Sequence, residues 1–439
     1  MIVAAVETGV AVETVADVIA DPVADEGVTV STLSSGLRVV CEHVPGALSV
    51  SAGIWVGVGA RDEPAPLCGV SHFLEHLLFK GTQRRSAREI ATAVDRVGGD
   101  MNAYTSKEST AYLCRVPARH LGLALDILGD VITSPSLRDD DVESERHVIL
   151  EELAMDDDAP DDTAYRLFAD AVFPEHPLGR ETAGDPTTVR SITADDVREY
   201  FAATYGVDRM VVAVAGPIVH DEVVAWAEST LGQHRRSTIG VDRSLPTVGP
   251  RAVVGEERDC EQVHIVVGGR ALDRHDPDRE ALDMVMHALG GGPSSRLFQT
   301  IREERGLTYS TYSSSSSFSD AGLFAAYAAT NPEHAAEVRT LLDAEIDAIS
   351  KHGITAEELE VAKGYLTGAF SMGFEGTGSR LERIGSSLTN YGRIRPLAEQ
   401  VRRWESVTLD DTRRVVERVL SGTRVRCAVG PVVPAALLG

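Results

Sequence analysis

The sequence predicts an α+β fold built from two similar halves, and three observations lead to this prediction. The chain has 439 residues, a length typical of two to four domains. Segments 50–60 and 262–271 share an alternating apolar strand pattern with glycines near its end. Each half also closes on a short valine-rich strand, at 210–215 and at 424–429.

The elements between these strands follow one order in both halves. An internal duplication of about 200 residues explains this better than the loose similarity that any α+β chain can show. The expected pairs are apolar helices (70–79 and 278–289), strands rich in Tyr, Ser and Thr (101–115 and 307–318), amphipathic helices (118–133 and 333–350) and charged helices (138–155 and 355–370).

The predicted boundaries follow from composition. Residues 1–30 contain no Lys or Arg and form an acidic extension that we expect to be mobile. Residues 31–231 form the N-terminal half and residues 251–439 the C-terminal half. The polar stretch 232–250, with its Gly and Pro, is the expected linker.

Charge, hydropathy and cysteine use exclude several classes of protein. The 67 acidic and 42 basic residues give a formal charge of −25, which argues against a nucleic-acid partner because phosphate binding needs a basic face. No run of eighteen apolar residues predicts a membrane span. The five cysteines are widely scattered, so we expect free, mostly buried thiols. Since no secretory signal or transit peptide is recognisable, we expect a cytoplasmic protein.

One segment, VSHFLEHLLFKGT at residues 70–82, predicts metal chemistry. Its apolar spacing, and Gly81 near its end, favour a helix of about three turns. His72, Glu75 and His76 lie at i, i+3 and i+4 and share one face. Two imidazoles one turn apart can bind zinc, and a neighbouring carboxylate can deprotonate a zinc-bound water. Chance gives this pattern in roughly 3 of 100 such chains, but burial of three ionisable groups favours a metal.

A third zinc ligand is expected from the charged helix at 138–155. Glu145 and Glu152 lie two turns apart on one stripe of this helix. One carboxylate can reach a zinc ion held by another helix, while the second orients a histidine ligand. Spacing alone leaves Glu151 and Glu152 as alternative ligands.

Five runs then carry a resemblance that covers residues 33–430: HFLEHLLFKGT, NAYTSKEST, ERHVILEE, HPLGR and SSRLFQTIREERGLTYS. Together they resemble the pitrilysin-like or inverzincin zinc peptidases, which include insulin-degrading enzyme and the mitochondrial processing peptidase. Within this family, the chain resembles a bacterial member of the mitochondrial-processing-peptidase type. The resemblance implies two α/β-sandwich halves arranged as a clamshell, with one Zn²⁺ per chain. Relatives of this length commonly pair, so a homodimer is expected.

The resemblance implies roles for residues of the N-terminal half. His72, His76 and Glu152 correspond to the zinc ligands. Glu75 corresponds to the general base, and Glu145 to the family's supporting acid.

The C-terminal half lacks the metal motif, since its equivalent helix contains only His287. Arg302 and Tyr309 match an arginine and a tyrosine that this half contributes in the family. Aimed at the scissile carbonyl, they would stabilise the oxyanion of the tetrahedral intermediate.

Three further residues are candidates for substrate binding. The resemblance implies that a peptide adds to the strand edge at Asn102 and Ala103 by main-chain hydrogen bonds; from the residues alone, an interior strand is as good a prediction. The acidic stretch 151–162 is expected to be a solvated loop, with attraction of basic peptides as the sharper alternative. Asp162 matches an acid that binds arginine-bearing presequences in processing peptidases, whereas Arg166 stands where another such acid is expected.

The sequence thus predicts a zinc metalloendopeptidase that hydrolyses unfolded peptides or trims presequence-like segments, with Glu75 activating a zinc-bound water. Two alternatives remain. The chain would be a catalytically silent, peptidase-like scaffold subunit of a larger complex, or a metal hydrolase that does not cleave peptides. A metal assay and a peptide-cleavage assay separate the three.

Overall fold

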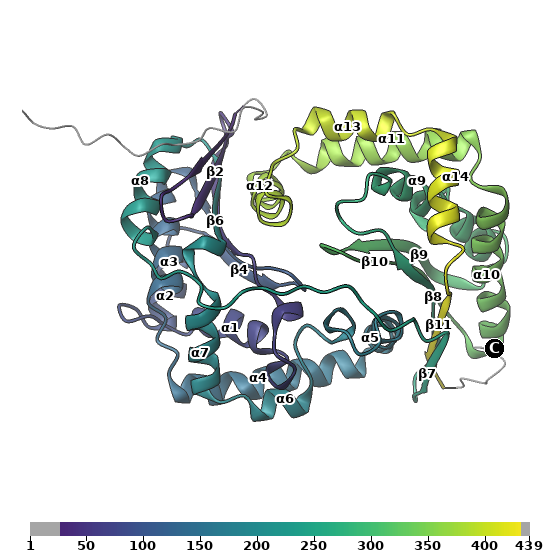
Figure 1. The fold of residues 1–439 in the computed structure, drawn as a ribbon, viewed down its shortest axis with the longest axis horizontal. Coiled ribbons are helices and arrows are strands. Elements are labelled where there is room, and N and C mark those ends of the chain that lie inside the picture. Colours follow the sequence, from purple (N-terminus) through teal and green to yellow (C-terminus); the bar gives the residue numbers. More distant parts are fainter. Residues whose placement is uncertain (1–26, 432–439) are drawn as a thin grey trace, which may run out of the picture.

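Two α/β halves face each other in the computed structural model of the chain, which describes residues 27–431 (Figure 1). Each half has one β-sheet with helices packed on it, and together they form the expected clamshell. Residues 1–26, most of the predicted acidic extension, lie outside the described part of the chain. Val28 is buried and pairs with Glu42. The first sheet therefore begins at Val28, slightly before the predicted boundary at residue 31.

The first sheet has six strands in the order β1-β2-β6-β3-β5-β4, so β4 lies at one edge. Strand β6 runs parallel to β2 and antiparallel to β3. Both central strands, β3 and β6, are buried almost throughout, as expected for strands that are covered on both faces. The strands are β1 (Val28–Thr32), β2 (Arg38–His43), β3 (Ser49–Val56), β4 (Asp100–Thr105), β5 (Thr110–Pro117) and β6 (Met210–Gly216).

The second sheet repeats this plan with five strands in the order β7-β11-β8-β10-β9. Strand β11 is parallel to β7 and antiparallel to β8, as β6 is to β2 and β3. The repeated topology matches the duplication expected from the sequence, with β1 as the additional strand. The strands are β7 (Val253–Glu257), β8 (Val263–Ala271), β9 (Thr308–Ser317), β10 (Gly322–Thr330) and β11 (Val425–Gly430).

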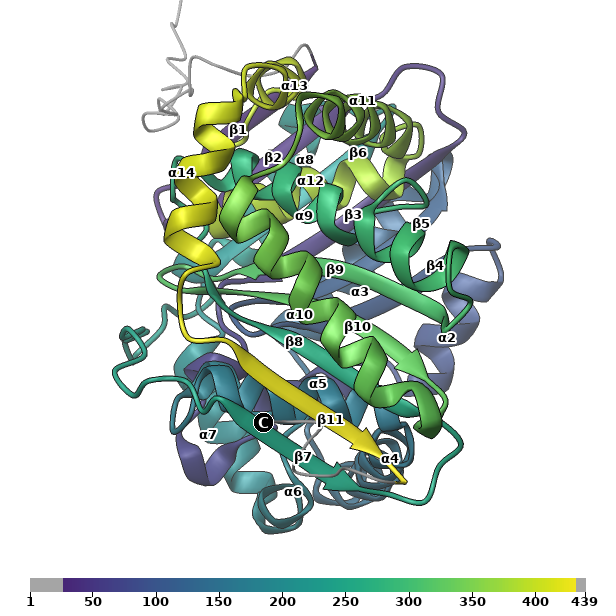
Figure 2. The ribbon, with the colours of Figure 1, turned by 90° about the vertical axis from the view of Figure 1, so that its right-hand side faces the viewer.

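Helices cover both sheets, and Figure 2 shows α10 lying across the second one. The first half contains α1 (Val70–Leu78), α2 (Ala87–Asp95), α3 (Leu121–Thr133), α4 (Asp139–Asp158), α5 (Pro160–Val172), α6 (Pro186–Ser191), α7 (Ala194–Thr204) and α8 (His220–Leu231). The second half contains α9 (Arg279–Gly290), α10 (Ala335–His352), α11 (Ala356–Gly373), α12 (Thr377–Tyr391), α13 (Leu397–Glu405) and α14 (Leu409–Val419).

Each half lends one helix to the sheet of the other half. Helix α12 packs on β2, β3 and β6 of the first sheet, where Leu381 and Ile384 join a buried cluster with Trp55. A Cβ atom at Gly385 would lie 2.3 Å from the Trp55 ring, so this glycine allows the close approach. In exchange, α5 packs on β7, β8 and β11 through side chains that include Phe168. The exchange fixes the two halves against each other.

The segment between α8 and β7 also contacts both halves. Arg243 binds Asp62 of the first half through two hydrogen bonds of 2.8 Å. The backbone oxygen of Val248 accepts a hydrogen bond from Arg270 of β8, in the second half. This segment, within the expected linker 232–250, is therefore attached to both halves.

Two expectations about local structure were wrong. The segment 101–115 is not one strand but an antiparallel hairpin of β4 and β5, since Ser106–Ser109 form a turn closed by Ser106 N–H to the Ser109 oxygen at 2.8 Å. The acidic stretch 151–162 is helical rather than a loop. Pro160 begins α5, where a missing N–H costs nothing, and acids in a first turn suit the helix dipole.

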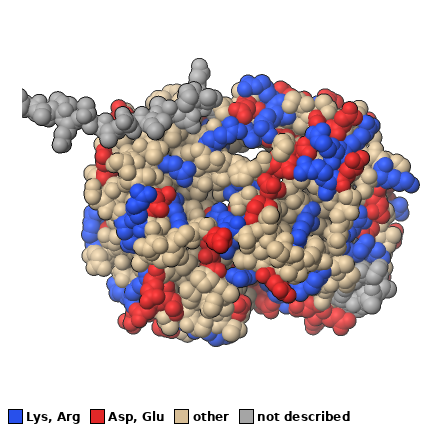
Figure 3. All heavy atoms as spheres, in the orientation of Figure 1, with Lys and Arg blue, Asp and Glu red and all other residues tan. Residues whose placement is uncertain are grey.

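Charge and thiol distribution complete the description. Basic and acidic side chains are interspersed on the face shown in Figure 3. Within residues 27–431, none of the helices is long and apolar enough to cross a membrane. All five cysteines are unpaired; Cys260 is partly exposed, and the buried ones are Cys41, Cys68, Cys114 and Cys427.

Candidate metal centre and active site

Helix α1 presents the predicted motif from an apolar base. Its side chains Val70, Phe73, Leu74, Leu77 and Leu78 are fully buried in the core of the first half. The motif residues lie on the remaining face, where they are partly exposed. Apolar burial therefore fixes the helix, while its polar face stays open to neighbouring groups.

Glu152 of α4 completes a three-residue donor set with the two histidines. Its Oε2 lies 3.8 Å from Nε2 of His72 and 3.4 Å from Nε2 of His76. One ligand atom from each of the three residues lies within 4.8 Å of the others. Glu151, the alternative left open by spacing, is exposed on α4. The structure thus brings Glu152, and not Glu151, to the imidazoles.

The donor set fits a zinc ion. Two imidazole nitrogens and one carboxylate oxygen are typical protein ligands of catalytic zinc, which leaves a further position for water or substrate. Burial, and secondarily the neighbouring His76, lower the pKa of His72 to about 4. His72 is therefore neutral near pH 7, and neutral imidazole is the form that binds a metal.

Glu145 supports His76 from the opposite side. This buried carboxylate lies 3.1 Å from Nδ1 of His76 through Oε2 and forms an ion pair with Lys80 through Oε1. Accepting the Nδ1 proton of His76 leaves its Nε2 lone pair facing Glu152. The role of Lys80 was not predicted. It lies one turn after His76, but its pairing with Glu145 becomes apparent only from the structure.

Glu75 lies beside the donor set with a partner of its own. Its Oε2 accepts a hydrogen bond of 2.7 Å from the Thr105 hydroxyl. Burial raises the pKa of Glu75, against the opposing effect of Thr105, and a raised pKa is suited to a group that accepts and releases protons. Thr105 ends β4, and its contact with α1 was not predicted.

Strand β4 lies at the edge of the first sheet, so it is not the interior strand that the residues alone left as an alternative. Asn102 is exposed, and its Oδ1 accepts the backbone N–H of Ala103 at 2.9 Å. The strand ends at Thr105, so the exposed edge leads directly to Glu75.

Arg302 and Tyr309 lie together in the second half. Arg302 belongs to a short π-helical segment, Phe298–Glu303, and its guanidinium carbon lies 4.8 Å from the centre of the Tyr309 ring. Tyr309 is 81% exposed. Among the described residues, no hydrogen bond, ion pair or ring contact joins either side chain to α1 or α4. The structure brings the pair together, but not into contact with Glu75.

Asp162 lines a cavity of about 990 Å³ between the two halves. The walls come from α4 and α5 and from strands β9 and β10. Burial, and then the nearby acids Asp161, Asp156 and Glu181, raise the pKa of Asp162. Arg166, also in the wall, pairs with Asp157 at 3.6 Å. The cavity therefore carries both acidic and basic groups.

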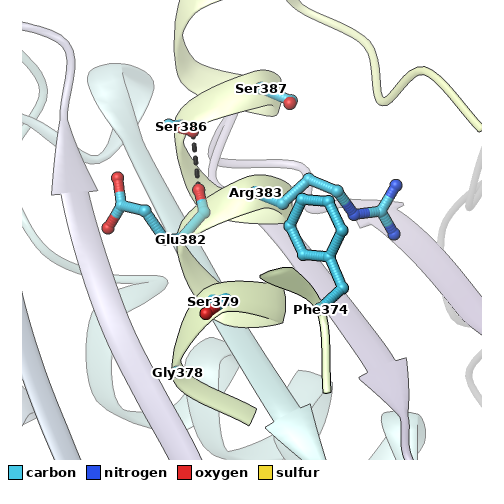
Figure 4. Close-up of a pocket in the computed structure, with 7 residues that line it drawn as sticks. All are labelled: Phe374, Gly378, Ser379, Glu382, Arg383, Ser386 and Ser387. Carbon is cyan, nitrogen blue, oxygen red and sulfur yellow. Dashed lines mark hydrogen bonds between the residues drawn. The ribbon is translucent and has the colours of Figure 1, made fainter. Parts of the chain in front are cut away.

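A separate, shallower pocket of about 550 Å³ lies along α12 (Figure 4). Glu382 and Arg383 point to opposite sides of the helix there. Glu382 accepts a hydrogen bond of 2.5 Å from Tyr104 of β4. None of the predicted site residues lines this pocket.

Two family models match consecutive parts of this chain. The family model described as "Insulinase (Peptidase family M16)" matches residues 38–186, and the model described as "Peptidase M16 inactive domain" matches residues 191–366. Together with the duplicated fold, these matches place the chain in the class of two-domain, peptidase-like proteins.

Relatives match over nearly the whole chain. A zinc protease of Mycobacterium tuberculosis is 42% identical over 94% of this chain and 95% of its own length. Zinc proteases of Mycobacterium leprae (41%, covering 92% of both chains) and Bacillus subtilis (33%, covering 91% and 97%) are also similar. The chain belongs to peptidase family M16, the pitrilysin-like family.

Solved structures share the fold. A peptidase M16 inactive domain from Pseudomonas fluorescens superposes with a TM-score of 0.85 at 21% identity, covering 92% of this chain and 98% of the other. A protease from Helicobacter pylori gives a TM-score of 0.84 at 22% identity, covering 92% and 99%.

Proposed function

We propose that this chain is a zinc-dependent endopeptidase that hydrolyses unfolded peptides or trims presequence-like segments. Zinc proteases at 33–42% identity support the activity. The observation that carries the proposal is the convergence of His72, His76 and Glu152, with Glu75 beside them. These three residues would hold one Zn²⁺ per chain.

Bound zinc would supply Lewis acidity, which polarises a carbonyl and makes a water easier to deprotonate. The protein's own groups then manage the proton. Glu75 takes a proton from the attacking water and returns it to the leaving amine, while the Thr105 hydroxyl orients its carboxylate. Glu145 keeps His76 in the tautomer whose Nε2 faces Glu152.

Arg302 and Tyr309 are proposed to stabilise the oxyanion of the tetrahedral intermediate. Their mutual contact at 4.8 Å supports a joint role. The pair would act on the scissile carbonyl when a substrate lies between the halves and the clamshell closes on it.

A substrate strand is proposed to pair with β4 at Asn102 and Ala103. Main-chain pairing recognises an extended backbone with little dependence on sequence, which suits unfolded substrates. The incoming strand would replace the bond from Ala103 N–H to Asn102. Asp162, in the cavity between the halves, would favour basic side chains, although Arg166 in the same wall opposes this.

Organisation and location are also proposals. We infer two units, 31–231 and 251–439, joined by residues 232–250, and a homodimer. The buried, unpaired thiols support a reducing compartment such as the cytoplasm.

The test is Glu75→Gln, which removes the base but none of the proposed ligands. The purified variant should retain about one zinc per chain and lose about 10²- to 10⁴-fold in cleavage of an unfolded, fluorogenic peptide, as expected for a lost general base. Wild-type protein stripped by a chelator should lose cleavage and regain it on addition of zinc. Unchanged cleavage by the variant would refute the assignment.

The same measurements separate the alternatives. Wild-type protein without stoichiometric zinc would favour the scaffold subunit of a larger complex. Stoichiometric zinc without cleavage of any peptide in a diverse library would favour another metal-dependent hydrolase. The library profile would also define the cleavage preference.

A further inference from the structure

The first turn of helix α1 donates backbone hydrogen bonds to a buried carboxylate, Glu63, which lies outside the helix. Glu63 is only 4% exposed. Its Oε2 accepts the backbone N–H of Gly69, and its Oε1 accepts the backbone N–H of Ser71, each at 2.7 Å. Both oxygens of one side chain are thus committed to the helix that carries the proposed metal motif.

Glu63 caps the N-terminus of α1, whose own N-cap residue provides no side-chain hydrogen bond. The N-cap residue is Gly69, which has no side chain to accept a hydrogen bond. It has φ +98°, and a Cβ there would lie 2.6 Å from the Ala183 oxygen, so a capping side chain would not fit. Other helices begin with a local side-chain cap: α2 at Ser86, α6 at Asp185, α7 at Thr193, α11 at Thr355 and α14 at Thr408.

Burying a carboxylate costs free energy, which hydrogen bonds to the carboxylate offset. Burial raises the pKa of Glu63 to about 7, opposed by the backbone N–H groups of Ser71 and Gly69 and, more weakly, by Lys107. An anion at a helix N-terminus interacts favourably with the exposed N–H groups and the dipole. The two hydrogen bonds also fix the rotation of the first turn, because they engage two different amides at once.

The two residues that precede Glu63 also form ion pairs and hydrogen bonds. Arg61 pairs with Asp320 of the second half at 2.7 Å. Asp62 accepts two hydrogen bonds of 2.8 Å from Arg243 of the linker. Glu63 therefore joins the start of α1 to a segment anchored on both the linker and the opposite half.

We propose that Glu63 is a positioning residue that sets the location of the metal motif on α1. Ser71, whose amide it binds, directly precedes His72, and Glu75 follows one turn later. A shift of the first turn would displace the donor set and the base together. This proposal rests on the proposed peptidase function, but its consequences for metal binding and for α1 are measured separately.

The test variant is Glu63→Gln, which keeps the size of the side chain. The amide offers one oxygen, and its NH₂ group cannot accept the second backbone N–H. We expect kcat to fall about 10- to 100-fold with KM nearly unchanged, since a small misplacement of reacting groups has effects of this size. Zinc affinity, measured by chelator competition, should weaken about 10-fold, as for lost supporting contacts at metal sites. Hydrogen exchange in the first turn of α1 should accelerate.

The matched control is Asp196→Asn at the start of α7. This carboxylate accepts the backbone N–H of Thr193 at 2.8 Å, but α7 carries none of the site residues. We expect wild-type kcat, zinc affinity and α1 exchange from the control. Glu63→Asp, which restores the charge on a shorter side chain, should recover part of the lost kcat.

Several outcomes would overturn the proposal. Wild-type kcat, zinc affinity and α1 exchange in Glu63→Gln would show that the contact positions nothing, and a lower Tm with wild-type kcat would show a purely structural role. Should Glu63→Gln fail to fold, wild-type kcat and zinc affinity in Glu63→Asp would be decisive against it. If Glu75→Gln cleaves peptides normally, the proposed function fails, while zinc affinity and α1 exchange still judge Glu63.

Discussion

Helices α1 and α9 follow equivalent strands, β3 and β8, in the two halves, yet their polar residues meet different surroundings. On α1, the motif residues face carboxylates of α4 and the Thr105 hydroxyl, and they remain partly exposed. On α9, each polar side chain is occupied by a partner within the second half. Glu280 binds Arg403 and Arg395 at 2.7 Å, Asp283 accepts from the Trp404 indole at 3.0 Å, and His287 stacks on Tyr365 at 4.4 Å.

The difference shows that a helix with ionisable residues is not a site by itself. Whether such a helix forms a candidate site depends on the element that packs against it. Helix α4 presents Glu145 and Glu152 to α1, whereas α11 and α13 present an aromatic ring, an indole and a guanidinium to α9. A duplicated fold can therefore hold one candidate metal centre and one structural core at equivalent places.

The largest expected difference between α1 and α9 comes from replacing one histidine on each helix. His76→Ala should weaken zinc binding by more than the 10- to 100-fold that loss of an outer partner costs, and peptide cleavage should disappear with the metal. His287→Ala should leave zinc content and kcat unchanged while lowering Tm, because it removes a buried ring from a stack. Zinc titration and a thermal melt measure both. Equal zinc loss in the two variants would refute the distinction.

A smaller effect is expected from the carboxylate behind His76. Glu145→Gln keeps a hydrogen-bond acceptor for Nδ1 but removes the charge that faces both His76 and Lys80. We expect zinc affinity or kcat to fall roughly 10-fold, at the low end for such supporting groups. Chelator competition and initial rates provide the measurement, with Glu151→Gln on the exposed side of α4 as the unaffected control. A Glu145→Gln protein that matches this control would show that the contact is dispensable.

The smallest effect on activity is expected from the second half. Glu280→Gln should leave cleavage unchanged and lower the free energy of unfolding by about 1–3 kcal/mol, because two arginines lose a charged partner. Burial opposes ionisation of Glu280, but Arg403 and Arg395 prevail and its pKa is lowered. A lowered folded-state pKa gives stability that is present above the unfolded-state pKa and is lost as the pH falls through the folded-state pKa.

The pH dependence supplies the control for that variant. In urea denaturation, wild type should exceed Glu280→Gln in stability by the full amount at pH 7. The gap should close as the pH falls below the normal glutamate value of about 4.3. A gap that is independent of pH would mean that packing, rather than charge, stabilises this cluster.

Much of the fold was predictable because it depends on periodicity. The alternating strands and the apolar face of α1 have regular spacing, and regular spacing places His72, Glu75 and His76 on one face. The choice of Glu152 over Glu151 needed the resemblance, since two adjacent acids on a helix differ only in direction. In the structure that direction depends on how α4 packs against α1.

The remaining contacts had no periodic signal. Thr105 reaches Glu75 across 30 residues from the end of a strand, and Glu63 reaches Ser71 from a loop. Such contacts depend on how separate elements meet in space. The acidic stretch at 151–162 misled for a related reason: its charges suggest solvation, but its acids and Pro160 also suit the start of a helix.

The exchange of α5 and α12 also affects how the chain is made. The face of the first sheet that points toward the second half is covered by Leu381, Ile384 and Leu388 of α12 (Figure 1), which are synthesised long after β6 is complete. At roughly 5–20 residues per second, a nascent chain carries this apolar face uncovered for on the order of ten seconds. This apolar face stays uncovered until α12 emerges, and a chain that ended before residue 377 would expose it permanently.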